Sequence, residues 1–347
     1  MFEKITLHTP RTFVPDDLNA GDWAALAPLF EQLEQQLSAA ADAVQLEQAI
    51  LNWEELSAAI AEESSKRTIA MTCQTDDKTA EQAYLDFVEQ IEPEVKTSSF
   101  RLAKALADHP HRDGLPAKRY EVFTRDTALE VELFRRENVA LETETTKLGQ
   151  QYQKLIGSLA VPFDGEERTL VQMGRYLEET DRARRQEAWE LVANRRLEEA
   201  ETIDGQLDSL AKRRNQMSAN AGFPNYRDFA HRRKGRFDYT PDDCLAFHDA
   251  IEQEMVPLLK ELHDERQAAL GIESVRPWDT ATDPQGRPPL KPFEEVPQLI
   301  RRTQAIFDQL DGDLASWFRT MQDLNLLDLA NRKGKAPGGY QDSLAEA

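Results

Sequence analysis

Residues 22–37 read DWAALAPLFEQLEQQL and decide the fold class. Apolar side chains recur there every three or four residues, which is the spacing of one face of an α-helix, while Glu and Gln occupy the other face. The apolar positions are Trp23, Leu26, Leu29, Phe30, Leu33 and Leu37. The stretch therefore predicts an amphipathic helix that begins at Asp22.

Similar helical patterns cover most of the chain. They recur at residues 50–60, 84–91, 100–106, 127–159, 180–221, 240–270 and 296–321. The clearest helix start is Thr240-Pro241-Asp242-Asp243, because Thr can cap, Pro suits the first helical position, and the carboxylates face the positive end of the helix dipole. Gly222, followed by Pro224, and Gly271 are placed to end helices. We find no internal repeat, and the sequence predicts a mainly α fold of irregular multi-helix domains.

One β-hairpin interrupts the helical pattern. Leu159, Val161 and Phe163 alternate with other residues, Asp164-Gly165 can supply the positive φ angles of a tight turn, and residues 168–171 can return antiparallel. With about 150 residues per domain as a prior, we place a domain boundary beside this hairpin. The expected domains are an amino-terminal helical domain at 1–160 and a second domain at 161–347.

Two later stretches differ in composition from the helical segments. Five of the seventeen prolines fall within residues 277–292, which excludes a continuous helix and predicts an extended crossing with many turns. Residues 328–340 read DLANRKGKAPGGY, a loop rich in glycine and positive charge.

The composition limits the classes of partner. With 63 acidic and 42 basic residues the formal charge is -21, which repels phosphate backbones and anionic membrane surfaces. No run approaches the roughly 20 apolar residues of a membrane span, and the first thirty residues lack a basic start followed by an apolar run. Cys73 and Cys244 lie far apart in sequence, as suits a reducing compartment, and buried packing is their expected role. We expect a soluble cytoplasmic protein without nucleic-acid or membrane partners.

The histidines do not form a recognisable zinc motif. A helical zinc hydrolase needs two histidines four residues apart, with a glutamate after the first as general base. None of the six histidines satisfies this spacing. His263 comes nearest, but position 267 is Gln267. The sequence predicts no metal ligand in this chain.

The remaining histidines have simpler interpretations. His109-Pro110-His111 could hold a stray metal, although a solvated loop is the favoured interpretation. His248 falls on the apolar stripe of its helix and is expected to be a hydrogen-bonded core histidine. His8 and His231 have no partner visible in the sequence.

Other catalytic signatures are also missing. There is no Gly-x-Ser-x-Gly elbow, neither cysteine lies in a glycine-bounded turn, and Gly334, Gly338 and Gly339 lack the strand and helix that flank a phosphate loop. The basic cluster at residues 231–236, HRRKGR, suggests an anion-binding protein as a weaker alternative. The favoured interpretation is structural, because cations in a last helical turn stabilise its carbonyl end.

Four segments, in this order, carry a family resemblance. They are EETDRARRQEAW at 178–189, RNQ at 214–216 with AGFPNYRDF at 221–229, RPWD at 276–279, and the loop at 328–340. Together they resemble the zinc oligopeptidases of the oligoendopeptidase F and thimet oligopeptidase type, most weakly over residues 1 to about 120. The resemblance implies that these helices form part of the wall of a zincin-type peptidase cleft.

In that family the Gly-Gly-Tyr loop leads toward the helix that carries His-Glu-x-x-His. The resemblance implies a zinc-dependent oligoendopeptidase hydrolysing peptide bonds in short peptides, in which a zinc-polarised water attacks the carbonyl and glutamate takes its proton. The second domain would be the proximal helical part of the peptidase domain, ending before the zinc-binding helix. We expect this chain to be an amino-terminal portion, inactive alone, whose reading frame continues past Ala347, and we expect it to expose apolar surface and to associate.

The resemblance implies only cleft-lining roles for residues of this chain. Gly338, Gly339 and Tyr340 are expected near the substrate backbone, with Arg332 positioning the loop; the structural alternative is that they merely shape the entry to the active-site strand. A second interpretation of the whole chain is a non-catalytic helical interaction protein derived from the peptidase fold.

Overall fold

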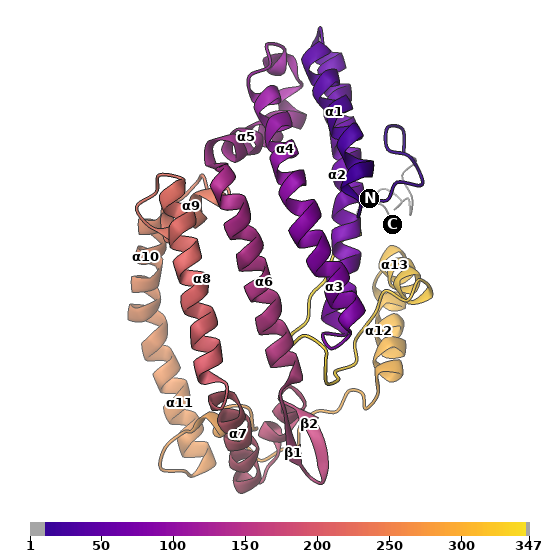
Figure 1. Ribbon diagram of the computed structural model, residues 1–347. Coiled ribbons are helices and arrows are strands. Elements are labelled where there is room, and N and C mark those ends of the chain that lie inside the picture. The colour runs from indigo at the N-terminus through magenta and orange to yellow at the C-terminus, as the bar shows by residue number, and fades with distance from the viewer. Residues whose placement is uncertain (1–10, 345–347) are drawn as a thin grey trace. The chain divides into compact units, whose positions relative to one another are not determined.

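The computed structural model describes residues 11–344. This part of the chain is mainly helical and contains one two-stranded antiparallel sheet, as predicted (Figure 1). Its contacts group it into two compact units. The first holds the described parts of Met1–Lys154, Thr202–Asp249 and Gly338–Ala347, and the second holds Leu155–Glu201 and Ala250–Pro337. The domain boundary at residue 160 stays a prediction.

The first two helices of the first unit begin at aspartate side chains. Asp22 accepts a hydrogen bond from the Ala24 amide at 2.9 Å, and Asp42 accepts from the Val44 amide at 3.0 Å. These aspartates satisfy amides that have no partner within the helix and face the positive end of its dipole. The elements are α1 (Trp23–Ala39), α2 (Ala43–Cys73), α3 (Lys78–Asp86), the π-helical turn η1 (Phe87–Ile91), α4 (Glu92–Ala107), the 3-10 turn η2 (Arg112–Gly114), α5 (Ala117–Leu133), most of α6 (Arg136–Ser158) and of α8 (Ala200–Asn220), α9 (Tyr226–Arg233), and α10 (Pro241–Ala250) up to Asp249.

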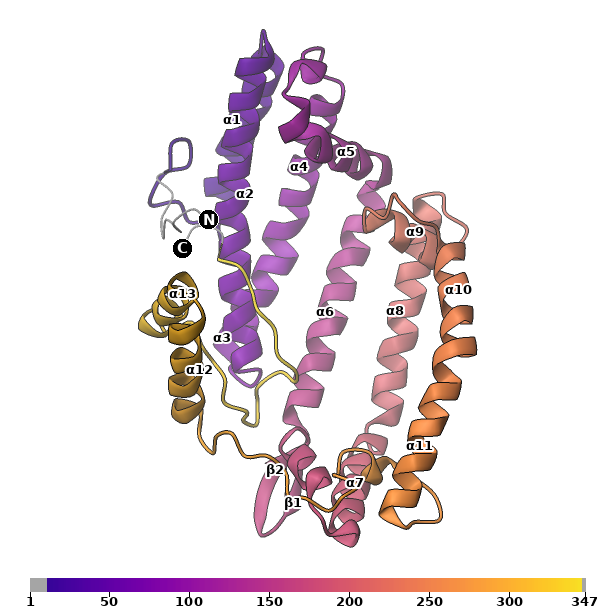
Figure 2. The same ribbon diagram turned by 180° about the vertical axis from the view of Figure 1, so that it is seen from behind.

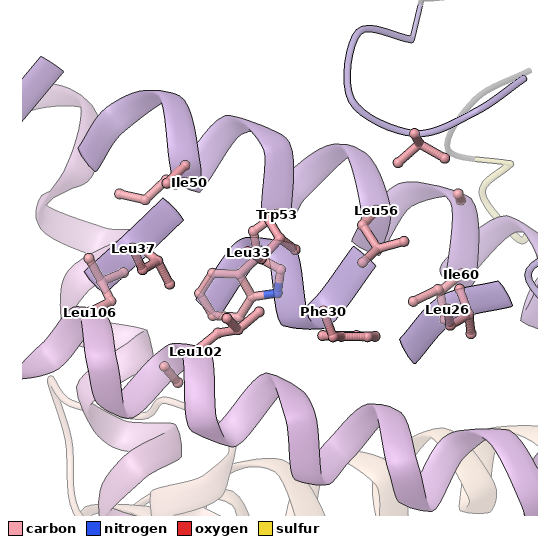
Figure 3. Packing of buried hydrophobic residues seen from close by; sticks show 14 of the residues in the cluster. Leu26, Phe30, Leu33, Leu37, Ile50, Trp53, Leu56, Ile60, Leu102 and Leu106 are labelled. Atoms are coloured by element: carbon pink, nitrogen blue, oxygen red, sulfur yellow. The ribbon is translucent and has the colours of Figure 1, made fainter. Parts of the chain in front are cut away.

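The main core of the first unit lies between α1, α2 and α4 (Figure 3). The apolar positions of residues 22–37 form its centre, since Leu26, Leu33 and Leu37 have no exposed surface and Phe30 is buried. Their partners are Ile50, Trp53, Leu56 and Ile60 of α2 and Leu102 and Leu106 of α4. The spacing of the apolar residues in the sequence is therefore the spacing of the buried residues in the structure.

A smaller core joins the end of α5 to α8 and α9. Leu133, Met217 and Phe229 are buried together there. The side-chain amide of Asn138 donates to the Met217 carbonyl at 3.0 Å, a second hydrogen bond beside the one from the Ala221 amide, and so links α6 to the end of α8. Gly222 has a φ of +82° and ends this helix at the predicted residue.

The second unit is built around the predicted hairpin, whose return strand lies at residues 166–169 rather than at the expected 168–171. Ala160 pairs with Thr169 and Phe163 with Glu166, and the turn residues Asp164 and Gly165 have φ of 54° and 76°. Positive φ at both positions is the geometry of a two-residue hairpin turn. The elements are the end of α6, β1 (Ala160–Phe163), β2 (Glu166–Thr169), the 3-10 segment η3 (Gln172–Glu178), α7 (Arg182–Leu197), the start of α8, the π-helical turn η4 (Ile251–Met255), α11 (Val256–Leu270), the 3-10 turn η5 (Pro277–Asp279), α12 (Val296–Leu310) and α13 (Gly312–Asp323).

The hairpin, η3 and α7 share one small core. Val161 and Phe163 of β1, Met173 and Tyr176 of η3, and Ala188 of α7 are buried in it. The side chains of residues 159–163, which were predicted to alternate, thus point alternately toward this core and toward solvent.

Three helical patterns are interrupted where the sequence suggested continuity. Residues 127–159 break at Phe134, whose ring stacks on Phe100 with centroids 4.0 Å apart, and residues 180–221 break at 198–199. Residues 296–321 break at Asp311, whose carboxylate accepts from the Asp313 and Leu314 amides and caps α13. At Phe134 a tertiary contact outweighs the weak helical preference of the chain, and at Asp311 a cap outweighs it.

Helices α11 and α12 expose apolar side chains. Leu259 and Leu262 of α11 and Ile306 and Leu310 of α12 are all at least half exposed. The exposed apolar surface that we expected is present, whereas association in solution stays a prediction. Among the described helices, none combines the length and the apolar content that a membrane span requires.

Candidate functional site

The loop at residues 328–337 is folded around one carboxylate. Arg332 donates from both terminal nitrogens to the two carboxylate oxygens of Asp328, each at 2.8 Å. Lys335 lies 3.1 Å from the same carboxylate and donates to the carbonyls of Asp328 at 2.6 Å and Ala330 at 3.1 Å. Two cations paired with one anion fix the shape of the loop, in which Gly334 would otherwise leave the backbone free.

This loop is attached to the hairpin of the same unit. The Thr169 hydroxyl donates to the Asn331 side chain at 2.6 Å, Lys333 pairs with Glu167 at 2.9 Å, and the Gly334 amide donates to the Gly157 carbonyl at 3.1 Å. The contacts of this loop with Asp328, Thr169 and Gly157 were not predicted from the sequence. Thr169 and Gly157 lie more than a hundred positions before the loop and give no local signal. Asp328 does offer one, because it stands four residues before Arg332.

The Gly338-Gly339-Tyr340 stretch belongs to the first unit. Gly338 has a φ of +92°, a conformation that disfavours any residue with a Cβ. The Tyr340 ring is largely exposed, and its hydroxyl lies 2.6 Å from that of Thr72 on α2. The Ser65 hydroxyl, also on α2, donates to the Asp342 carboxylate at 3.2 Å. These side chains hold an otherwise exposed segment against α2.

The predicted site residues therefore fall into both compact units. Gly338, Gly339 and Tyr340 lie in the first unit and Arg332 in the second. Arg332 holds Asp328 within its own loop, which fits the loop-positioning role proposed for it. Contact of these four residues with a substrate stays a prediction.

Two of the family motifs meet in the second unit. The buried carboxylate of Asp279, from the RPWD segment, accepts from Arg182 at 3.0 and 2.9 Å and from Arg185 at 3.0 Å. Burial raises the pKa of Asp279, but the hydrogen bonds from Arg182, the Arg276 amide and Arg185 outweigh it and hold the pKa below its usual value. Arg185 also donates to the Trp278 carbonyl at 2.8 Å. The network fastens the proline-rich crossing to α7 and is structural.

A cavity of about 350 Å³ lies beside this network. Thr180, Arg182, Arg185, Leu270, Thr282 and Asp283 are among its lining residues. Both guanidinium groups already donate hydrogen bonds to Asp279, so part of their hydrogen-bonding capacity is taken.

The residues that the structure describes do not fit a zinc ion. Zinc takes His, Cys or carboxylate ligands, and no group of three such side chains within residues 11–344 could hold a metal. His8 lies outside the described residues. The expected core role of His248 is wrong, since this side chain is exposed, as is His263. No residue of α10 or α11 is buried, so the apolar stripe that carries His248 is itself uncovered.

The other sequence candidates take structural positions. His109 accepts from the His111 amide at 3.2 Å, and the half-buried His231 packs edge-on against Tyr239. Cys73 and Cys244 are half-buried rather than fully buried.

The basic cluster at 231–236 closes α9. Arg232 pairs with Glu132 at 2.6 Å and Arg233 with Glu142 at 3.2 Å, while Gly235 has the left-handed conformation of a helix end. This is the geometry of the favoured structural interpretation, since these two cations already have carboxylate partners.

Three solved structures resemble this chain along almost all of its length. A protein assigned as oligoendopeptidase F from Bacillus anthracis strain Ames is 24% identical, with a TM-score of 0.87, and covers 95% of this chain and 61% of its own. PZ peptidase A with an inhibitor is 28% identical, with a TM-score of 0.87, and a further oligoendopeptidase F structure is 25% identical, with a TM-score of 0.85. In both cases the match covers 95% of this chain and 58% of the other. The fold is therefore that of the oligoendopeptidase F peptidases, and the chain spans about three fifths of the length of these structures.

Two family models match in sequence order. The Peptidase M3 N-terminal domain matches residues 16–134, and Peptidase family M3 matches residues 175–347. The chain belongs to peptidase family M3, as the four motifs predicted. The comparison with curated proteins found no match.

Proposed function

We propose that this chain forms the amino-terminal, helical portion of a zinc-dependent oligoendopeptidase that hydrolyses peptide bonds in short peptides. The observation that carries the proposal is the match of both M3 models, in order, to most of the chain. The inhibitor in the PZ peptidase A structure supports a ligand-binding cleft in a protein of this fold. The acidic charge and the two distant cysteines support a cytoplasmic location.

Within this portion, the segment Gly338-Gly339-Tyr340 is the proposed contact with the substrate backbone. Glycine leaves backbone N–H and C=O groups accessible to another chain, and an exposed tyrosine ring offers both apolar area and a polar end. Arg332 supports the preceding loop through Asp328. The proposal assigns zinc ligands to none of residues 11–344, so zinc binding and hydrolysis require residues beyond these.

Peptide binding and hydrolysis by the purified 347-residue chain separate the parts of this proposal. We expect a fluorescently labelled short peptide to bind in an anisotropy titration, and we expect a quenched version not to be cleaved, with or without zinc. Gly339→Val should weaken binding because its side chain obstructs the backbone, whereas Gly149→Ala, on the helix α6, serves as the matched control. Equal binding by Gly339→Val would remove this segment from the site.

Zinc binding is measured separately on the same chain. We expect no stoichiometric zinc after dialysis and metal analysis, and no difference between the chain and its His263→Ala variant. Stoichiometric zinc together with chelator-sensitive cleavage would contradict the proposal that the metal ligands lie elsewhere.

A non-catalytic interaction protein is the second candidate. The half-exposed apolar side chains of α11 and α12 favour it, because contiguous exposed apolar surface marks sites of association. The downstream reading frame distinguishes the two candidates. A continuation that encodes His-Glu-x-x-His supports the peptidase, and its absence supports the interaction protein.

A further inference from the structure

Thr72 is a buried hydroxyl at the end of α2 that reaches the proposed substrate segment. Only 4% of Thr72 is exposed, whereas Tyr340 is 58% exposed, and their hydroxyl oxygens lie 2.6 Å apart. A surface ring is thereby tied to a side chain fixed in the body of the unit. The two residues are 268 positions apart in sequence, so only the fold brings them together.

The other contacts of Thr72 decide the direction of this hydrogen bond. The Thr72 hydroxyl donates to the Thr68 carbonyl at 2.7 Å, with the Ile69 carbonyl farther away at 3.3 Å. A threonine hydroxyl has one proton to donate and lone pairs to accept. Tyr340 is therefore the donor to Thr72, and the two bonds form a relay from the phenol to the helix backbone.

A second hydrogen bond to the same face of α2 sets the direction in which residues 340–342 run. Ser65 and Thr72 are seven residues apart, which is two helical turns or about 10.5 Å along the axis. Ser65 contacts Asp342 and Thr72 contacts Tyr340, so residues 340–342 run antiparallel to α2 (Figure 2). Two residues of extended chain span only about 7 Å, and the long tyrosine side chain covers the difference.

We propose that Thr72 is a positioning residue for the peptide site: by accepting a hydrogen bond from the Tyr340 hydroxyl it fixes the ring and the backbone of residues 338–342 in the conformation that binds peptide. The proposal rests on the proposed function, because it takes Gly338, Gly339 and Tyr340 as the peptide contact. Thr72 itself is buried and acts through Tyr340. Its effect is preorganisation, which lowers the entropy lost when a ligand binds.

Fluorine NMR of the 347-residue chain labelled with 3-fluorotyrosine tests the contact directly. The Tyr340 resonance is assigned by its loss in Tyr340→Phe. Thr72→Val, which keeps the shape and removes the acceptor, should move this resonance toward that of free fluorotyrosine, whereas Thr72→Ser should leave it in place. Thr127→Val is the matched control, because Thr127 is equally buried and makes the same bond to the carbonyl four residues earlier, on α5.

Peptide affinity tests the consequence of the contact. Losing one hydrogen bond of ordinary net strength should weaken binding about fivefold in Thr72→Val and in Tyr340→Phe. The double variant should bind as either single variant does, since both remove the same interaction. Thr72→Ser and Thr127→Val should bind as the unmodified chain does.

An unmoved Tyr340 resonance in Thr72→Val, or equal losses of affinity in Thr72→Ser and Thr72→Val, would overturn the proposal. If the unmodified chain binds no peptide, the proposed function fails, and with it the role of Thr72 in affinity. The resonance shift would still report separately whether Thr72 holds Tyr340.

Discussion

Arg182 and Asp279 form a two-point ion pair, in which Nε and Nη2 of the guanidinium donate to the two carboxylate oxygens at 3.0 and 2.9 Å. The carboxylate is fully buried and takes a third hydrogen bond from Arg185, which is 2% exposed. A buried anion held by two cations has no water to replace a lost partner. The stability of the second unit should therefore depend strongly on this carboxylate.

We predict that Asp279→Ala lowers the free energy of unfolding by about 3–5 kcal/mol, because it leaves the buried Arg185 cation without its carboxylate. Urea unfolding followed by tryptophan fluorescence measures the change, since Trp278 and Trp189 lie close together in the same unit. Asp264→Ala, which removes an exposed pair with Lys260, is the control and should cost less than about 1 kcal/mol. Equal losses for the two variants would show that burial of Asp279 does not matter.

Glu81 should make the first unit sensitive to acid. Lys154 is the main cause that lowers the pKa of this carboxyl to about 2; burial opposes the shift, and Lys78 and Gln150 reinforce it. The pKa of Glu81 in the folded chain is thus below its unfolded value of about 4.3. Its ionised carboxylate therefore contributes its full stabilisation above about pH 4.3, and this contribution is lost as the pH falls toward about 2. Glu81→Gln should therefore cost about 2 kcal/mol at about pH 7 and almost nothing near the folded pKa.

Chemical unfolding between about pH 2 and about pH 7 measures this difference. The control is Glu89→Gln, whose more exposed pair with Lys147 should contribute less than about 1 kcal/mol. A difference between Glu81→Gln and the unmodified chain that stays constant over this range would rule out the ionised carboxylate as its source.

Asp328 should control the order of its loop. We predict that Asp328→Asn leaves the melting temperature nearly unchanged, because its ion pairs are partly exposed, but speeds trypsin cleavage after Arg332 and Lys335 several-fold. Mass spectrometry of a digestion time course identifies these cuts. Asp308→Asn, which removes the exposed pair with Arg319, should not change them. Unchanged cleavage in Asp328→Asn would mean that the hairpin contacts alone order the loop.

The core between α1, α2 and α4 should show the usual penalty of a cavity. Leu33→Ala removes a side chain with no exposed surface and is expected to cost about 2–5 kcal/mol. Val44→Ala, at a position that is 75% exposed, should change stability by less than about 0.5 kcal/mol. Thermal unfolding of the two variants compares them, and similar melting temperatures would contradict the assigned core.

The fold class and the hairpin could be predicted from sequence because both depend on neighbours along the chain. The spacing of Leu26, Leu33 and Leu37 repeats the period of the helix, and Asp164-Gly165 supplies the two positive φ angles of the turn. The break at Asp311 was missed because a cap competes with helix continuation by small free energies. The exposure of His248 was missed because a periodic apolar stripe predicts a face but does not supply a partner that covers it.

The sequence by itself determined that this protein is mainly helical, acidic and related to peptidase family M3, since composition, period and short motifs are local properties of the chain. Only the tertiary structure decided which side chains meet: Asp279 with Arg182 and Arg185, and Thr72 with Tyr340. Each such contact joins residues about 90 or more positions apart in sequence. Their free energy depends on burial and on a distance near 3 Å, and no pattern along the chain encodes either quantity.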